Sequence, residues 1–225
     1  MTLRSRVFLR FAVGVCFAAL LFLTAGTWKF WQAWMVLGTL FLPALGIFLY
    51  FAKHNPQLLQ RRLQSKEKTS QQRWTVCGLK FVALSAFLLP GLDHRFAWTR
   101  NAFGPVPLWL DLVAEVVLVM AFWINVWVMT VNPFASRTIQ VEPGQPVIST
   151  GPYHFVRHPM YAASLLMYLA LPIALGSYVA WPTFVLLIPF IVVRLLNEEK
   201  VLSRDLPGYS EYCLQTRSRL FPHIW

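Results

Sequence analysis

The stretch GPYHFVRHPMY, residues 151–161, collects titratable, aromatic and turn-forming residues at the edge of an apolar run. A second polar stretch, RLLNEE at residues 194–199, stands at the edge of the next apolar run. Polar groups that are kept beside hydrocarbon are costly, so they usually mark a functional site. We therefore expect the two stretches to line one site, with the apolar runs folding as helices behind it.

The composition places most of this chain in lipid rather than in water. Of the 225 residues, 57% are hydrophobic and only 13% are charged, and the mean hydropathy is +0.53. A soluble domain usually carries roughly a quarter charged residues. At ~20 residues for each span, the length suits about six transmembrane helices and leaves no room for a separate soluble domain. The fold class that we predict is an all-α, polytopic transmembrane bundle.

The apolar runs give the positions of these spans and of the segments between them. We predict spans at residues 7–27, 30–52, 74–92, 106–131, 159–177 and 181–196. Between the second and third spans, residues 53–73 are rich in Lys and Arg, which favours a helix on the membrane surface followed by a loop. Residues 197–225 predict an extension of the last helix, a break at Pro207-Gly208 and a short amphipathic helix. The two polar stretches then fall at the same face of the membrane.

The formal net charge of +11, from 20 Lys and Arg against 9 Asp and Glu, bears on orientation. Nucleic-acid binding would need a basic face on a soluble fold, and none is visible. With six spans, every Lys and Arg except Lys29, Arg95 and Arg100 lies on the side of the two termini. Because basic residues collect in cytoplasmic loops, we expect both termini and both polar stretches to be cytoplasmic. The membrane would be the plasma membrane, or the inner membrane in a bacterium.

Several other classes of site lack their sequence signals. The three cysteines, Cys16, Cys77 and Cys213, are far apart without a CxxC pair, so neither a disulfide framework nor a metal site is indicated. There is no Gly-rich phosphate loop, no HExxH and no GxSxG. A soluble methyltransferase of the Rossmann type is also disfavoured, because no strand–glycine turn–helix pattern occurs.

Arg194 and Glu198 are four residues apart, so they project from one face of a helix. An intrahelical ion pair whose arginine reaches back to the interface would explain them without any function. The functional interpretation gives them separate ligands. A planar guanidinium binds a carboxylate through two parallel hydrogen bonds, which suits an anionic acceptor group. The glutamate would then accept hydrogen bonds from a cationic or hydroxyl-bearing ligand.

Tyr153, His158 and Tyr161 surround Pro159, which is well suited to the first position of a helix. The His-Pro pair could therefore be only a helix start, and we interpret Arg157 as an interfacial anchor. Two tyrosines, a histidine, an arginine and two glutamates at one membrane face nevertheless favour a site.

Asp111 and Glu115 form a second acidic pair, four residues apart inside the fourth predicted span. An acid within a membrane span is a functional hypothesis by default. We favour structural pairing with Arg95 or Arg100 over a proton or ion path. A non-enzymatic, transporter-like bundle that uses this pair is the remote alternative.

Over roughly residues 140–222 the chain resembles the isoprenylcysteine carboxyl methyltransferase family and its phospholipid methyltransferase relatives. The motifs that carry the resemblance are Gly151-x-Tyr153, Arg157-His158-Pro159-x-Tyr161, Arg194, Glu198-Glu199, Gly208-Tyr209-x-x-Tyr212 and Leu220-Phe221-Pro222. The resemblance implies S-adenosylmethionine as cofactor, bound by Gln140, Gln145, Pro146, Val147, Ile148, Tyr153, His158, Pro159, Met160, Tyr161 and Glu198. It also implies that Arg194 binds the acceptor and that Arg194, Glu198 and His158 are the catalytic residues.

The expected activity is methyl transfer to a membrane-embedded acceptor, most simply the carboxylate of an isoprenylcysteine-like molecule. A carboxylate is ionised at neutral pH and needs no general base. The alternative is an amine or a phospholipid headgroup, which would need His158 or Glu199 as a base. In one structural unit, residues 1–131 would form the lipid-substrate side and residues 132–225 the methyltransferase-like region. The expected partners are this lipid or prenylated acceptor and membrane lipids, and the oligomeric state is open.

Overall fold

The computed structural model describes residues 3–54, 84, 85, 87–135, 141, 142 and 144–225. These residues form helices joined by turns and contain no strand, so the predicted all-α class is confirmed for them. The elements are α1 (Leu3–Ala25), α2 (Trp31–His54), α5 (Trp98–Phe103), α6 (Leu108–Val131), the 3-10 helix η1 (Gly151–His154), α7 (Pro159–Ala174), α8 (Trp181–Val185), α9 (Leu187–Asp205) and α10 (Tyr209–Gln215).

Two helices, α2 and α6, are long and apolar enough to cross a membrane by their length and composition. The segment Ala12–Ala25 of α1 and the whole of α7 are shorter apolar helices. Most of the third predicted span and all but the first two residues of the predicted surface segment lie outside the described residues. A bundle of six spans and the orientation of its ends therefore stay predictions.

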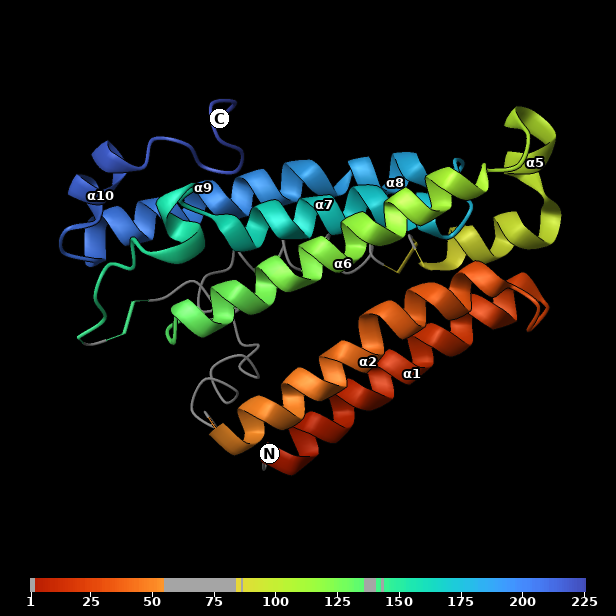
Figure 1. The fold of residues 1–225 in the computed structure, drawn as a ribbon, viewed down its shortest axis with the longest axis horizontal. Helices are drawn as coiled ribbons and strands as arrows, with labels where there is room; N and C mark the ends of the chain where they lie inside the picture. The colour runs from red at the N-terminus through yellow and green to blue at the C-terminus, as the bar shows by residue number, and fades with distance from the viewer. Residues whose placement is uncertain (1–2, 55–83, 86, 136–140, 143) are drawn as a thin grey trace.

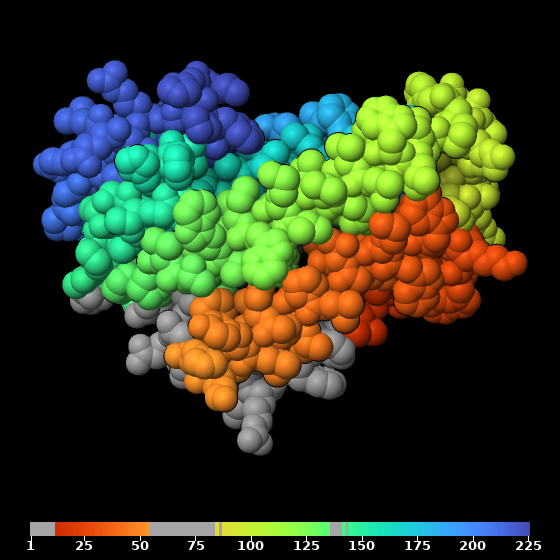
Figure 2. Space-filling model, in the orientation of Figure 1, coloured from red at the N-terminus to blue at the C-terminus, as the bar shows by residue number. Residues whose placement is uncertain are grey.

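The helices run roughly parallel, with α6 packed along α7, α2 on α6, and α9 on α7 (Figure 1). The start of α1, α10 and η1 lie toward one end of the bundle, whereas the α1–α2 turn and α5 lie at the other (Figure 1). In the space-filling view, α10 and the C-terminal residues gather at the first end, away from the turn of the N-terminal hairpin (Figure 2). The segments that carry the predicted site are thus neighbours in space.

The main core lies between α1, α2, α6, α7 and α8. Its largest fully buried side chains include Phe30, Leu118, Leu175 and Phe184. Close packing of these side chains holds the five helices together. A second cluster joins α7 and α9 to Leu220, and this contact fixes the relative positions of the two helices that carry the polar stretches.

The last predicted span is interrupted. The sequence predicts one helix over residues 181–196, whereas the structure has α8 and α9 with a turn at Leu186. Pro189 has no backbone N–H, so it cannot donate to the carbonyl of Val185 four residues earlier. The N–H of Leu186 donates to the carbonyl of Pro182 at 3.2 Å, which closes the last turn of α8. Beyond the break, α9 continues to Asp205, and α10 begins after Gly208 as the sequence predicts.

The predicted pairing of Asp111 and Glu115 with Arg95 or Arg100 is wrong. Both acids are buried in α6, and among the described residues no ion pair joins them to either arginine. Neutral side chains of α2 face them instead: Gln32 hydrogen-bonds Asp111 and Thr39 faces Glu115. The Arg95 guanidinium is turned away and lies over the ring of Phe96.

Candidate active site

The segment before α7 is shaped by one glycine and one proline. Gly151 has a φ of +61°, and a Cβ there would meet Val131 Cγ2 at 2.9 Å. Glycine therefore lets η1 sit directly against the end of α6. Pro159 then starts α7, and the carbonyl of His158 accepts the N–H groups of Tyr161 and Ala162 at 3.1 Å. Residues 151–161 therefore cross the end of α6 within a few residues.

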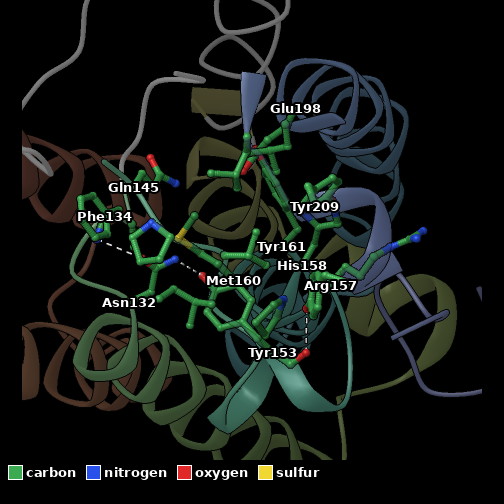
Figure 3. Close-up of a pocket in the computed structure, with 18 residues that line it drawn as sticks. Asn132, Phe134, Gln145, Tyr153, Arg157, His158, Met160, Tyr161, Glu198 and Tyr209 are labelled. Carbon is green, nitrogen blue, oxygen red and sulfur yellow. Dashed lines mark hydrogen bonds between the residues drawn. The ribbon is translucent and has the colours of Figure 1, made fainter. Parts of the chain in front are cut away.

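A cavity lies between this stretch, the end of α6, the segment before η1, α9 and α10 (Figure 3). Its volume is about 800 Å³, with open solvent at its mouth included. The residues that line it are Asn132, Phe134, Ala135, Gln145, Pro146, Val147, Ile148, Tyr153, Arg157, His158, Pro159, Met160, Tyr161, Glu198, Leu202, Leu206, Tyr209 and Tyr212.

The structure brings nearly all the predicted site residues to this cavity. Every residue predicted to contact the cofactor lines it except Gln140, which lies outside the described residues. Arg194 does not line it. The residues predicted to bind the cofactor and the residue predicted to bind the acceptor therefore occupy different places in the structure.

Tyr161 and Glu198 join the two polar stretches directly. The Tyr161 hydroxyl donates to Glu198 Oε2 at 2.6 Å, across 37 positions of sequence. Arg194, one turn before Glu198 and half-buried, also lies within hydrogen-bonding reach of the Tyr161 hydroxyl. The three side chains form a connected polar group at the α7–α9 contact, with Glu198 and Tyr161 on the cavity wall.

Glu199 points away from the cavity into a cluster of cationic donors. Its Oε1 lies 3.0 Å from an Arg157 Nη2 and 3.3 Å from His158 Nε2, and Arg219 Nε donates to its Oε2 at 2.8 Å. Burial alone would raise the pKa of this carboxyl, but the donors outweigh burial and lower the pKa to about 2. Glu199 is thus a fully engaged carboxylate at neutral pH.

The interpretation of Arg157 as an interfacial anchor is wrong. Its side chain is only 9% exposed, it is paired with Glu199, and it lines the cavity. A lone arginine at the edge of an apolar run looks the same in sequence whether it reaches the interface or a buried acid. Glu199, which decides between the two, lies 42 positions later in the chain.

The segment after α10 completes this side of the site. The N–H groups of Arg157 and His158 donate to the carbonyls of Ser218 and Arg219, each at 2.9 Å. The Arg219 guanidinium lies over the Trp225 ring, 5.1 Å from its centroid. Sequence reasoning missed Arg219, because it stands in a polar tail with several other basic residues.

Sequence reasoning also missed Asn132, although it is the first polar residue after a long apolar run. Its side-chain amide donates to the Tyr153 hydroxyl at 2.8 Å and its Oδ1 accepts the Phe134 N–H at 2.9 Å. On the other side, the Tyr212 hydroxyl donates to the Tyr153 carbonyl at 2.7 Å. Tyr153 is thereby held from both α6 and α10.

The cavity has a consistent chemistry. One carboxylate, several phenols and an imidazole share the wall with apolar side chains such as Val147 and Leu202. Such a wall suits a ligand that combines a flat or apolar part with cationic and hydroxyl groups, because each buried polar group of the ligand then finds a partner.

Comparisons with known proteins match the part of the chain that builds most of the cavity. Residues 110–206 match the model of a family described as phospholipid methyltransferase. A protein of Bacillus subtilis (strain 168), named as uncharacterized protein YpbQ, is 28% identical over 100 residues. That match spans 44% of this chain and 58% of the relative's length. The matched residues run from α6 to the end of α9 and supply most of the cavity wall. Over this region, the chain is similar to the phospholipid methyltransferase family, as the sequence motifs predict.

Proposed function

We propose that the protein transfers a methyl group from S-adenosylmethionine to an acceptor embedded in the membrane. The observation that carries the proposal is the hydrogen bond between Tyr161 and Glu198 on the wall of a cavity built by the family-matched region. When bound, S-adenosylmethionine supplies a methyl group on a positively charged sulfur. The chain's own part is to bind this donor, exclude water and align the acceptor.

The residues on the cavity wall fit this donor. Glu198 would accept hydrogen bonds from its amino or ribose hydroxyl groups, and the rings of Tyr153 and Tyr161 suit a nearby cation. Apolar residues such as Val147 and Ile148 would cover its flat adenine ring. The wall thus offers the polar and apolar partners that a sulfonium nucleoside requires.

For the acceptor, we propose a carboxylate held by Arg194, as in an isoprenylcysteine-like molecule. Arg194 lies one turn from Glu198 but outside the cavity wall, so it can bind a second molecule without competing for the donor. A carboxylate is already ionised at neutral pH, so the reaction needs alignment rather than proton removal.

The second candidate is an amine, such as that of a phospholipid headgroup, and the family description favours it. An amine must lose a proton before or during transfer. His158 lines the cavity, whereas Glu199 is held by Arg157 and Arg219 and does not line it. For this acceptor, His158 is therefore the base that we propose, with Glu199 holding the imidazole.

Donor binding is tested by calorimetry with S-adenosylmethionine and the full chain in lipid nanodiscs. Absence of binding would refute the proposal. The acceptor is tested with methyl-labelled donor and a panel of prenylcysteine analogues, fatty acids and ethanolamine phospholipids. A rate that rises with pH through one ionisation near neutrality would favour the amine, and a flat profile would favour the carboxylate.

The division of roles is tested by Arg194→Ala. We expect the donor dissociation constant to stay within about 3-fold of the wild-type value while turnover with a carboxylate acceptor falls at least about 100-fold, because a charged hydrogen-bond partner is lost. The exposed Arg217→Ala is the matched control. Equal loss of donor binding and turnover would contradict the assignment of Arg194 to the acceptor.

A further inference from the structure

Two residues that line the cavity each have a buried donor atom without a hydrogen-bond partner in the described structure: Arg157 Nε and the Tyr209 hydroxyl. Both side chains are at least nine-tenths buried, with exposures of 9% for the Arg157 side chain and 4% for Tyr209. Buried polar atoms are nearly always paired, so each of these atoms calls for an explanation.

Both groups are donors at neutral pH. A guanidinium keeps its protons and has no acceptor atom. Burial raises the pKa of the Tyr209 phenol well above its ordinary value, and the nearby charge of Glu199 acts in the same direction. The hydroxyl therefore stays protonated, and the partner that both atoms lack is an acceptor.

The two donors belong to the same corner of the cavity. Both residues line it, and the charge of Arg157 acts on the Tyr209 hydroxyl. Glu199 Oε1 pairs with Arg157 Nη2 at 3.0 Å, and this pairing leaves Arg157 Nε without a partner in the described structure. Glu199 is bound by both Arg157 and Arg219, so its negative charge is already balanced and does not compete for Arg157 Nε.

We propose that Arg157 Nε and the Tyr209 hydroxyl form a subsite for a carboxylate, namely the carboxylate of the amino-acid part of the methyl donor. This identity rests on the proposed function. Both residues line the cavity while their donor atoms are buried, so we expect Tyr209 to rotate toward the ligand and the Arg157 guanidinium to turn about its contact with Glu199 when the ligand binds. Glu198 on the same wall offers the opposite charge, so the cavity can receive an amino group and a carboxylate at separate places.

The subsite is tested with two probes that differ only in this group: S-adenosylmethionine and its decarboxylated analogue. Calorimetry on the wild-type protein should show a preference for the intact donor of about 10- to 100-fold, the range for one or two charge-assisted hydrogen bonds. Tyr209→Phe removes one donor and keeps the ring. Arg157→Lys keeps the charge but removes Nε. Each variant should reduce the preference about 10-fold or abolish it.

Tyr212→Phe is the matched control. Its hydroxyl lines the same cavity but is already committed to the Tyr153 carbonyl at 2.7 Å, so the ratio of the two affinities should not change. Using a ratio also cancels a general loss of affinity that a loosened fold would cause. A ratio that falls equally in Tyr212→Phe would overturn the assignment to Tyr209.

The remaining outcomes separate this inference from the proposed function. If the wild-type protein binds both probes equally, the subsite is overturned and the donor site stands. If equal binding is accompanied by a raised KM for an anionic acceptor in Tyr209→Phe, the two donors bind the acceptor instead. If neither probe binds, both the subsite and the proposed function are refuted.

Discussion

In the described structure, α6 and α9 each carry a pair of acids, and the two pairs differ mainly in their partners. Glu198 and Glu199 of α9 meet a phenol and three cationic or imidazole donors, respectively. Asp111 and Glu115 of α6 are 3% and 7% exposed, yet Asp111 Oδ1 and both Glu115 carboxyl oxygens have no hydrogen-bond partner in the described structure.

The difference shows where along a helix an acid can gain several hydrogen-bonding partners. The α9 pair stands where the helix leaves the apolar core, so cationic groups from η1–α7 and from the segment after α10 can reach it. Within the part of the chain that the structure describes, the polar neighbours of the α6 pair on α2 are Gln32 and Thr39. A carboxylate that is fixed by several donors holds one geometry, which is what a binding site requires.

The largest expected difference between the two acid pairs is in their effect on binding of the methyl donor. Glu198→Ala removes a carboxylate from the cavity wall and leaves the Tyr161 hydroxyl without its partner. We expect the dissociation constant for S-adenosylmethionine to rise about 100-fold, because hydrogen bonds to a charged group are lost. Glu115→Ala should change it less than about 3-fold. Comparable losses in the two variants, measured by calorimetry, would remove the distinction between the pairs.

The second effect is on acid stability. The pKa of Glu199 falls from an ordinary 4.5 to about 2 in the fold, which bounds its contribution at about 3 kcal/mol, less after solvent screening. Because the folded pKa is depressed, this stability is complete above about pH 5 and is lost as pH falls through 4.5 toward 2.

The variant Glu199→Gln should therefore have a lower unfolding temperature than the wild type at pH 7. Between pH 5 and pH 3, the unfolding temperature of the variant should fall by less than that of the wild type. Thermal unfolding in detergent across this window measures both quantities. The exposed Glu211→Gln is the control and should follow the wild-type curve. A Glu199→Gln curve that runs parallel to the wild-type curve would mean that the cationic cluster does not stabilise the fold.

A smaller effect is expected from the outer member of that cluster. Arg219 is 31% exposed, so solvent screens its bond to Glu199. Arg219→Ala should cost about 1 kcal/mol, or a fall of about 2–4 °C in unfolding temperature. Arg217→Ala, two residues earlier and exposed, should leave the temperature unchanged. If the two variants behave alike, the segment after α10 does not brace Glu199.

The smallest effect is expected at the α6 pair. Asp111→Asn and Glu115→Gln replace buried acids that lack cations by neutral groups of the same shape. Because no ion pair among the described residues is broken, we expect an unfolding temperature that is unchanged or a few degrees higher. A marked loss of stability in either variant would reveal a partner that balances the pair, and the comparison would have to be redrawn.

The sequence predicts the site better than its surroundings. Tyr161 and Glu198 could be placed together because each stands at the polar edge of an apolar run, and the predicted topology puts both edges on the same side. The roles of Arg157 and Arg219 could not be predicted, because both depend on contacts with Glu199, which is distant from each of them in the sequence. Periodicity locates the faces of helices, but it carries no information on contacts between distant segments.

The same limit explains the errors in the fold. The break at Leu186 follows from Pro189, three residues later. The prediction placed one helix there because the apolar run is long enough for a single span. The environment of Asp111 depends on how α2 rotates against α6, which the apolar pattern of two nearly uniform helices leaves undetermined. Polar residues at the edges of apolar runs are therefore more predictable than polar residues within such runs.

The backbone hydrogen bonds from Arg157 and His158 to residues 218 and 219 have a consequence for biosynthesis. The helices that precede this segment can insert and pair while it is still inside the ribosome. Glu199, however, gains its Arg219 partner only when that segment emerges. The cluster of donors around Glu199 is therefore completed only after residues 218 and 219 have been synthesised, later than the helices that it braces.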